Sequence, residues 1–123
     1  MNRKMLLSAM FATGLAVLIP GLGSANDLDI TGNYNCQGKN ADGSTYRGEV
    51  EITKKGNTYI INWLIGGQKF NGLGILEGNV LAVSYYGNSS GVVAYRVEGD
   101  SKLVGRWTSL QLNGKVNKEV LTK

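Results

Sequence analysis

Few side chains of this sequence are suited to acid–base or metal chemistry. The chain has no histidine, so it lacks the commonest general base and the commonest metal ligand. Cys36 is the only cysteine, and one cysteine without histidine cannot assemble a zinc site. Glu49 and Glu51 lie on one face of an alternating segment with Arg47, so we expect a solvated row of charges and not a buried catalytic pair. We predict no catalytic residue, no metal and no cofactor, and therefore no enzyme.

The single cysteine also bears on stability. Cys36 has no second cysteine with which to form an intramolecular disulfide, so the domain must be held together by its core alone. Free cysteines are among the most buried residue types. We predict that Cys36 is a small buried apolar side chain, with pairing between two molecules as the alternative.

The first 25 residues are typical of a secretory signal peptide. Arg3 and Lys4 precede an apolar run over residues 5–19, which is too short to span a bilayer, and small residues lead up to Ala25. We predict cleavage after Ala25, a single domain over residues 26–123, and export to the periplasm or the extracellular space. An N-terminal membrane anchor is the alternative that the short run disfavours.

The charge of the mature chain is small. Removing Arg3 and Lys4 leaves 11 basic and 9 acidic residues, a formal charge of +2 in place of the +4 of the whole chain. Lysine and arginine form neither a block nor a one-signed stripe, so nucleic acid is not expected as a partner. We also expect a monomer with no membrane span in the mature chain.

The stretch from Asn57 to Tyr86 sets the architecture. It predicts three strands joined by two tight turns, Gly66-Gly67 and Glu77-Gly78, where glycine tolerates positive φ angles. Apolar and polar residues continue to alternate with a period of two on both sides of this stretch. The segments predicted as strands are Gly32–Gly38, Thr45–Lys54, Asn57–Ile65, Gln68–Leu76, Asn79–Tyr86, Val92–Glu98, Lys102–Thr108 and Lys118–Thr122.

These eight segments predict an all-β fold without a helix. Asn26–Asp29 is expected to be a short polar lead, and Ser109–Asn117 a long loop. An eight-stranded antiparallel meander most economically closes into an up-and-down barrel, because closure removes exposed edges. A two-sheet sandwich is the alternative. A transmembrane barrel is disfavoured because charged residues, and not an apolar band, occupy the face opposite the apolar one.

The large aromatic residues gather toward one end of the predicted barrel. Successive turns of a meander alternate between the two ends, which places the three longer loops and the turn Gly66-Gly67 at one end and the other tight turns at the opposite end. Mouths lined by apolar and aromatic groups are the usual ligand sites of small barrels. The alternative, which we favour, is that the rings fill an interior only just wide enough for side chains. The residues predicted for a binding site at this end are Tyr46, Trp63, Phe70, Tyr85, Tyr86, Asn88 and Trp107.

Several short motifs carry a family resemblance. The sequence Gly32-Asn33-Tyr34, the run from Asp42 to Gly48, the run from Gly78 to Tyr85 and Gly105-Arg106-Trp107 resemble small exported bacterial proteins of largely uncharacterised function, some of them labelled fibronectin-binding. The resemblance implies an exported β-domain and a matrix-binding role. The opening Gly-x-Tyr is also similar to the first strand of calycin barrels, the lipocalin and avidin kind.

These observations lead to a non-catalytic exported binding protein. The first hypothesis is an adhesion module that binds a protein of the host matrix, such as fibronectin, through the long-loop end. The alternatives are a carrier of a small apolar ligand in the aromatic mouth, and an inhibitor of an envelope or host enzyme that inserts the loop Gly87–Gly91. A flat, wet loop surface would favour the first, a dry cavity the second and a protruding rigid loop the third.

Overall fold

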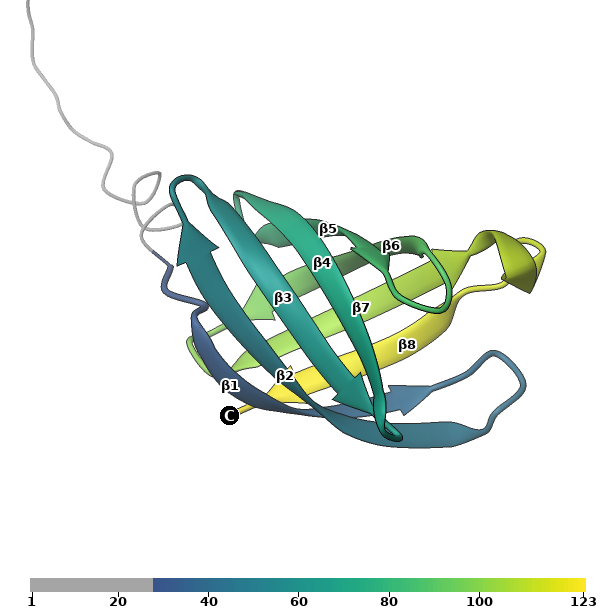
Figure 1. Cartoon of the computed structure of the whole chain (residues 1–123). Coiled ribbons are helices and arrows are strands. Elements are labelled where there is room, and N and C mark those ends of the chain that lie inside the picture. Colours follow the sequence, from purple (N-terminus) through teal and green to yellow (C-terminus); the bar gives the residue numbers. More distant parts are fainter. Residues whose placement is uncertain (1–27) are drawn as a thin grey trace, which may run out of the picture.

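The computed structural model describes residues 28–123, which form a closed barrel of eight antiparallel strands (Figure 1). Each strand pairs with the next along the chain, and β8 closes the barrel against β1. The fold is the predicted up-and-down barrel and not the two-sheet sandwich. The strands are β1 (Gly32–Lys39), β2 (Thr45–Lys55), β3 (Thr58–Ile65), β4 (Gln68–Glu77), β5 (Val80–Tyr86), β6 (Gly91–Glu98), β7 (Lys102–Ser109) and β8 (Asn117–Thr122).

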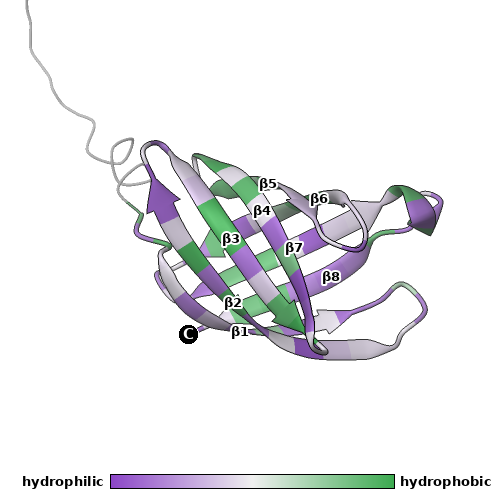
Figure 2. Cartoon of the chain, in the orientation of Figure 1, coloured by the Kyte–Doolittle hydropathy of each residue, from purple (hydrophilic) through white to green (hydrophobic). Residues whose placement is uncertain are grey.

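The alternation along each strand separates the inside of the barrel from the outside. On β2, Val50 and Ile52 are buried while Glu49 and Glu51 are exposed, so the predicted surface row of carboxylates is confirmed. Successive side chains of a strand point to opposite faces, and Figure 2 shows the resulting bands of hydrophobic and hydrophilic residues along β2. The apolar positions of all eight strands meet in one core.

The observed elements differ from the predicted ones only in detail. Every predicted strand end lies within one residue of the observed end. No helix was expected, but the loop after β7 contains a single turn of 3₁₀ helix, η2 (Leu110–Leu112), which ends at Asn113 in the left-handed region. Leu110 is 94% exposed, so this turn lies outside the core and leaves the barrel undisturbed.

The end of the barrel that carries the tight turns is closed by the segment before β1. Ile30 is buried, and Leu28 packs against the core. The hydroxyl of Tyr34 donates a hydrogen bond of 2.8 Å to the carbonyl oxygen of Ile30 and holds the segment in place. The expectation of a purely polar lead over residues 26–29 is therefore wrong at Leu28, because the open end of a barrel offers apolar surface that such a side chain can cover.

Two sequence expectations concern the chain beyond the barrel strands. Within residues 28–123 the structure contains no helix long and apolar enough to cross a membrane. The predicted signal peptide, and its cleavage after Ala25, lie outside the described residues.

Candidate functional site

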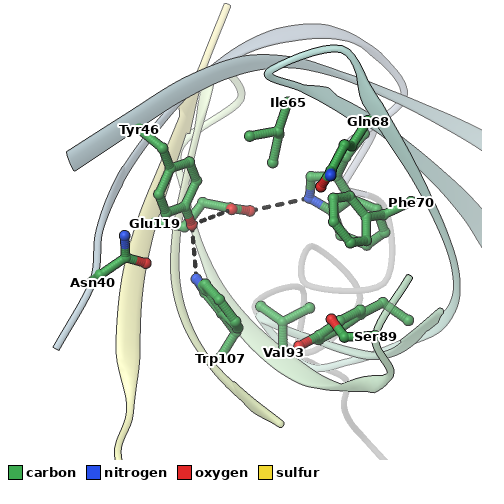
Figure 3. A pocket seen from close by; sticks show the side chains of 11 residues that line it. Asn40, Tyr46, Ile65, Gln68, Phe70, Ser89, Val93, Trp107 and Glu119 are labelled. Atoms are coloured by element: carbon green, nitrogen blue, oxygen red, sulfur yellow. Dashed lines mark hydrogen bonds between the residues drawn. The ribbon is translucent and has the colours of Figure 1, made fainter. Parts of the chain in front are cut away.

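The opposite end of the barrel is hollow. We call it the mouth, and define it by the four loops 40–44, 66–67, 87–90 and 110–116. A cavity of about 260 Å³ opens there, and Figure 3 shows its side chains arranged around a central space. The residues that line it are Asn40, Tyr46, Trp63, Ile65, Gln68, Phe70, Tyr85, Ser89, Val93, Trp107 and Glu119.

Five aromatic rings form most of the wall of the mouth. The Trp107 ring lies 6.3 Å from Tyr46 and 6.0 Å from Tyr85, measured between ring centroids. Tyr85 in turn lies 6.2 Å from Trp63 and 6.3 Å from Phe70. All four pairs meet edge to face, at interplanar angles between 67° and 83°. Edge-to-face contact is a favourable geometry for aromatic pairs, so each ring helps to hold its neighbours in place.

A buried carboxylate lies among these rings. Glu119, on β8, is only 4% exposed. Its Oε1 accepts a hydrogen bond of 2.8 Å from the Tyr46 hydroxyl, and its Oε2 accepts from Trp63 Nε1 at 3.1 Å and from the Tyr95 hydroxyl. Trp107 Nε1 donates to the Tyr46 hydroxyl at 2.7 Å, and Trp63 Nε1 is also 3.1 Å from the Tyr95 hydroxyl. Figure 3 shows the hydrogen bonds that join the Tyr46 hydroxyl to Glu119 and to Trp107.

Side-chain hydrogen-bond donors converge on Glu119. An indole N–H can only donate, so the hydroxyl of Tyr46 accepts from Trp107 and directs its own proton at Glu119. The hydroxyl of Tyr95 accepts from Trp63 and donates to Glu119 in the same way. Both oxygens of Glu119 therefore have hydrogen-bond partners in the wall. These hydrogen bonds make the burial of the carboxyl group tolerable.

The groups around Glu119 stay protonated. Burial, followed by the negative charge of Glu119, raises the pKa of Tyr95 well above its ordinary value, and the same two causes raise the pKa of Tyr46. Burial and then Glu119 likewise raise the pKa of the Cys36 thiol. The hydroxyls therefore remain donors, and Cys36 is buried, as the sequence predicts. A buried thiol of raised pKa is chemically inert.

Two glycines make room for the tyrosines that bind Glu119. Gly38 pairs with Tyr46 across β1 and β2, and a Cβ at position 38 would lie only 1.8 Å from the Tyr46 ring. Gly105 pairs with Tyr95 on one side and with Glu119 on the other, and a Cβ there would lie 2.6 Å from the Tyr95 ring. Each tyrosine ring lies over the backbone of the paired strand at the glycine, where no side chain is in the way. Glycines that weaken a strand interior are here required by the site.

A second buried polar residue fixes the rim of the mouth. Asn117 is 2% exposed, and its Oδ1 accepts a hydrogen bond of 2.6 Å from the backbone N–H of Ala41. Its Nδ2 donates to Oδ1 of Asn40 at 3.3 Å. The start of β8 is thereby tied to the loop 40–44, which places Asn40 in the cavity wall.

The structure brings most of the predicted site residues together. The five that line the cavity are Tyr46, Trp63, Phe70, Tyr85 and Trp107. Tyr86 does not line it and is 58% exposed, because Tyr85 takes the inward position and the next residue of a strand must face outward. Asn88 is not in the wall either, but its Nδ2 donates to Oε1 of the lining residue Gln68 at 3.0 Å.

The interior is only partly filled by the aromatic side chains. We expected the rings to fill the whole width of the barrel, and at the mouth this is wrong because a cavity of about 260 Å³ remains. At the closed end the expectation holds, since Ile30, Leu81 and Leu103 are completely or almost completely buried there.

Sequence reasoning missed Glu119, which is the central polar group of the site. In the last strand the consecutive residues Val120 and Leu121 are both apolar. The alternation therefore does not say whether Glu119 faces into the barrel or outward. A signal lies in the hairpin that β7 and β8 form, where Trp107 pairs with Asn117 and Gly105 with Glu119. Because directly paired residues share a face, the inward position of Gly105 and Trp107 would have placed Glu119 inside.

Comparison with known proteins supports the fold. No family model matches the chain, and neither does any curated protein. Among solved structures, a redesigned beta barrel aligns with a TM-score of 0.66 at 13% identity, covering 76% of this chain and 90% of that one. A redesigned beta barrel, mFAP1, bound to DFHBI, aligns with a TM-score of 0.64 at 13% identity over 76% of this chain and 94% of that one. A de novo designed fluorescence-activating beta barrel aligns at 0.60 and 16% identity, over 76% and 92%.

Proposed function

We propose that this protein is a non-catalytic, exported binding protein that holds a small, largely apolar ligand in its mouth. The observation that carries the proposal is the cavity of about 260 Å³ walled by five aromatic rings. Small-ligand sites are typically concave and apolar, with a few fixed polar groups that orient the ligand. The mouth has this composition, with Glu119, Asn40 and Gln68 as its polar groups.

Two further observations support binding without chemistry. The oxygens of Glu119 are engaged by hydrogen-bond donors of Tyr46, Trp63 and Tyr95, so the carboxylate is committed to holding the wall together. One of the similar barrels, mFAP1, is bound to DFHBI. At 13% identity this likeness concerns the fold, and it supports only the idea that a barrel of this architecture has space for a ligand.

The cavity favours a ligand carrier over the adhesion hypothesis that the sequence suggested first. Binding of a host-matrix protein remains the second candidate, because Tyr86 and Leu110 expose large apolar surface near the mouth, at 58% and 94%. Exposed aromatic side chains are frequent anchors of protein interfaces. The resemblance to proteins labelled fibronectin-binding, and the calycin resemblance, remain hypotheses.

A fragment screen with two matched variants tests the proposal. Small ring compounds would be screened by thermal shift and by tryptophan fluorescence, since both tryptophans of the chain line the cavity. Val93→Phe places a ring in the cavity wall and should abolish binding of any hit, whereas Tyr86→Ala, at an outward position of the same end, should leave it unchanged. If no fragment binds, or if Tyr86→Ala and not Val93→Phe removes binding, the small-ligand proposal is wrong and a protein partner is favoured.

A further inference from the structure

The mouth contains a buried carboxyl group, that of Glu119, without a positively charged side chain in the cavity wall. Both ion pairs among the described residues, Arg96 with Glu98 and Lys102 with Glu98, involve exposed side chains. No lysine or arginine is among the residues that line the cavity. Glu119 is therefore balanced only by the dipoles of its hydrogen-bond donors, inside a cavity whose walls are mainly apolar.

The unmet requirement of Glu119 is charge and not hydrogen bonding. A carboxylate offers about four lone-pair positions, and Tyr46, Trp63 and Tyr95 already occupy three of them. A neutral ligand with one more donor would add little. A positive charge placed in the cavity would instead interact with the whole carboxylate at low effective dielectric, where Coulomb attraction is stronger than in water.

The aromatic walls favour the same sign of charge. Tyr85 stands nearly perpendicular to Trp107 and to Phe70, at 83° and 82°, and Tyr46 meets Trp107 at 71°. Rings at these angles meet edge to face and do not stack, and all of them line one cavity. The face of an aromatic ring is electron-rich, and cavities lined by several rings bind organic cations, including quaternary ammonium groups that have no N–H to donate.

We propose that the ligand class of the mouth is an organic cation, whose positive group lies against Glu119 and Tyr46 while its apolar part contacts the remaining rings. This proposal rests on the proposed function, because it names the charge of the ligand that the cavity holds. It assigns Glu119 a part in ligand selectivity in addition to its part in holding the wall. Anions of the same size should be excluded.

Three probes of nearly equal shape separate charge from size. Meta-hydroxyphenyltrimethylammonium is a cation, meta-tert-butylphenol is its neutral isostere, and meta-hydroxybenzenesulfonate is an anion. Calorimetry and the fluorescence of Trp63 and Trp107 would measure the binding of each probe to the unaltered protein. We expect the cation to bind at least about tenfold more tightly than the neutral isostere, because it gains both carboxylate and ring attraction, and the anion to bind most weakly.

A pair of variants then locates the source of the preference. Glu119→Gln keeps the size of the side chain and one acceptor oxygen but removes the charge, so it should bring cation and isostere to within about threefold of each other, leaving mainly the ring attraction. Glu98→Gln neutralises an exposed carboxylate and should leave the preference unchanged. If Glu119→Gln does not fold, the comparison of the three probes on the unaltered protein still decides the question.

The possible results distinguish this proposal from the one on which it rests. Binding of the neutral isostere as tightly as the cation, or a cation preference that survives in folded Glu119→Gln, would overturn the charge assignment and leave Glu119 with a purely structural part. The small-ligand function would stand in both cases. If none of the three probes binds and no fragment of the earlier screen binds either, both proposals fail.

Discussion

The two ends of this barrel are built from the same strands yet are filled in different ways. At the closed end, aliphatic side chains such as Leu81, Leu103 and Leu121 meet in the middle, with Ile30 as a lid. At the mouth, rings stand edge to face around a cavity. An eight-stranded barrel is just narrow enough for side chains to fill. At the closed end aliphatic groups fill that width together with the buried rings of Tyr34 and Tyr59, whereas the edge-to-face rings of the mouth leave it open.

The two ends also differ in their buried hydrogen bonds. Among the described residues, the buried side-chain hydrogen bond of the closed end is neutral and runs from Tyr34 to the Ile30 backbone. The mouth has a chain of bonds that runs from Trp107 through Tyr46 to the carboxyl group of Glu119, and on to Tyr95. Each member of such a network fixes the orientation of the next. This explains how the rings of the mouth are prevented from collapsing into the cavity.

The largest effect is expected from a cavity made at the closed end. Leu103 and Trp107 lie on the same strand, one at each end. Leu103→Ala should destabilise the protein by about 2–5 kcal/mol, as is usual for a fully buried leucine, and should not change ligand binding by the folded fraction. Trp107→Ala, at the wall of an existing cavity, should cost less stability but abolish binding. Denaturant unfolding measures the loss of stability and calorimetry the loss of binding. A larger loss of stability in Trp107→Ala, or a loss of binding in Leu103→Ala, would contradict the assignment of stability to the closed end and of binding to the mouth.

Removal of single hydroxyl groups should separate the two polar arrangements. Tyr95→Phe takes a donor from the buried carboxylate of Glu119, at a cost of about 1.5–3 kcal/mol for a hydrogen bond to a charged group. Tyr34→Phe removes the neutral bond to Ile30, at a cost of about 0.5–1.5 kcal/mol. Both changes delete one oxygen, so they are matched in size. If urea unfolding shows the same loss of unfolding free energy for both variants, the hydrogen bond to Glu119 stabilises the protein no more than the neutral bond to Ile30.

A substitution at Gly38 should disturb the mouth through the Tyr46 ring. Gly38→Ala would force that ring away from the backbone of β1, with a cost of about 1–3 kcal/mol typical of overpacking. In a Tyr46→Ala background the same substitution should cost much less, since the clash is gone. A double-mutant cycle of unfolding free energies measures this coupling. Additive losses would show that the glycine is needed for another reason.

The smallest effect concerns alkaline pH at the closed end. Burial is the main cause that raises the pKa of Tyr34 from 10.0 to about 12. The folded state therefore favours the neutral phenol, while the unfolded chain ionises near the ordinary value. The stabilising contribution of Tyr34 is complete below pH 10 and is lost as the pH rises toward about 12. Unfolding free energies measured across this window should decline less steeply in Tyr34→Phe than in the unaltered protein. The same slope in both would disprove the assignment.

Much of the barrel could be predicted, because its signals are local. The period of two and the turn glycines lie within a few residues of each other, and they place every strand end to within one residue of the observed position. The same alternation placed Tyr46, Trp63 and Trp107 at one end. Tyr86 was predicted at the rim of this end, and the structure places it there as an exposed residue outside the cavity wall.

By itself, the sequence determined an all-β meander with its large rings gathered at one end, since patterns within single strands and turns are sufficient for that. Only the tertiary structure decided that Glu119 points into the barrel, because β8 has apolar residues at both parities and takes its facing from its pairing with β1 and β7. The tertiary structure also decided that the mouth keeps an open volume. Whether five rings collapse or stand apart depends on contacts between residues distant in the chain, such as the bond from Tyr46 to Glu119.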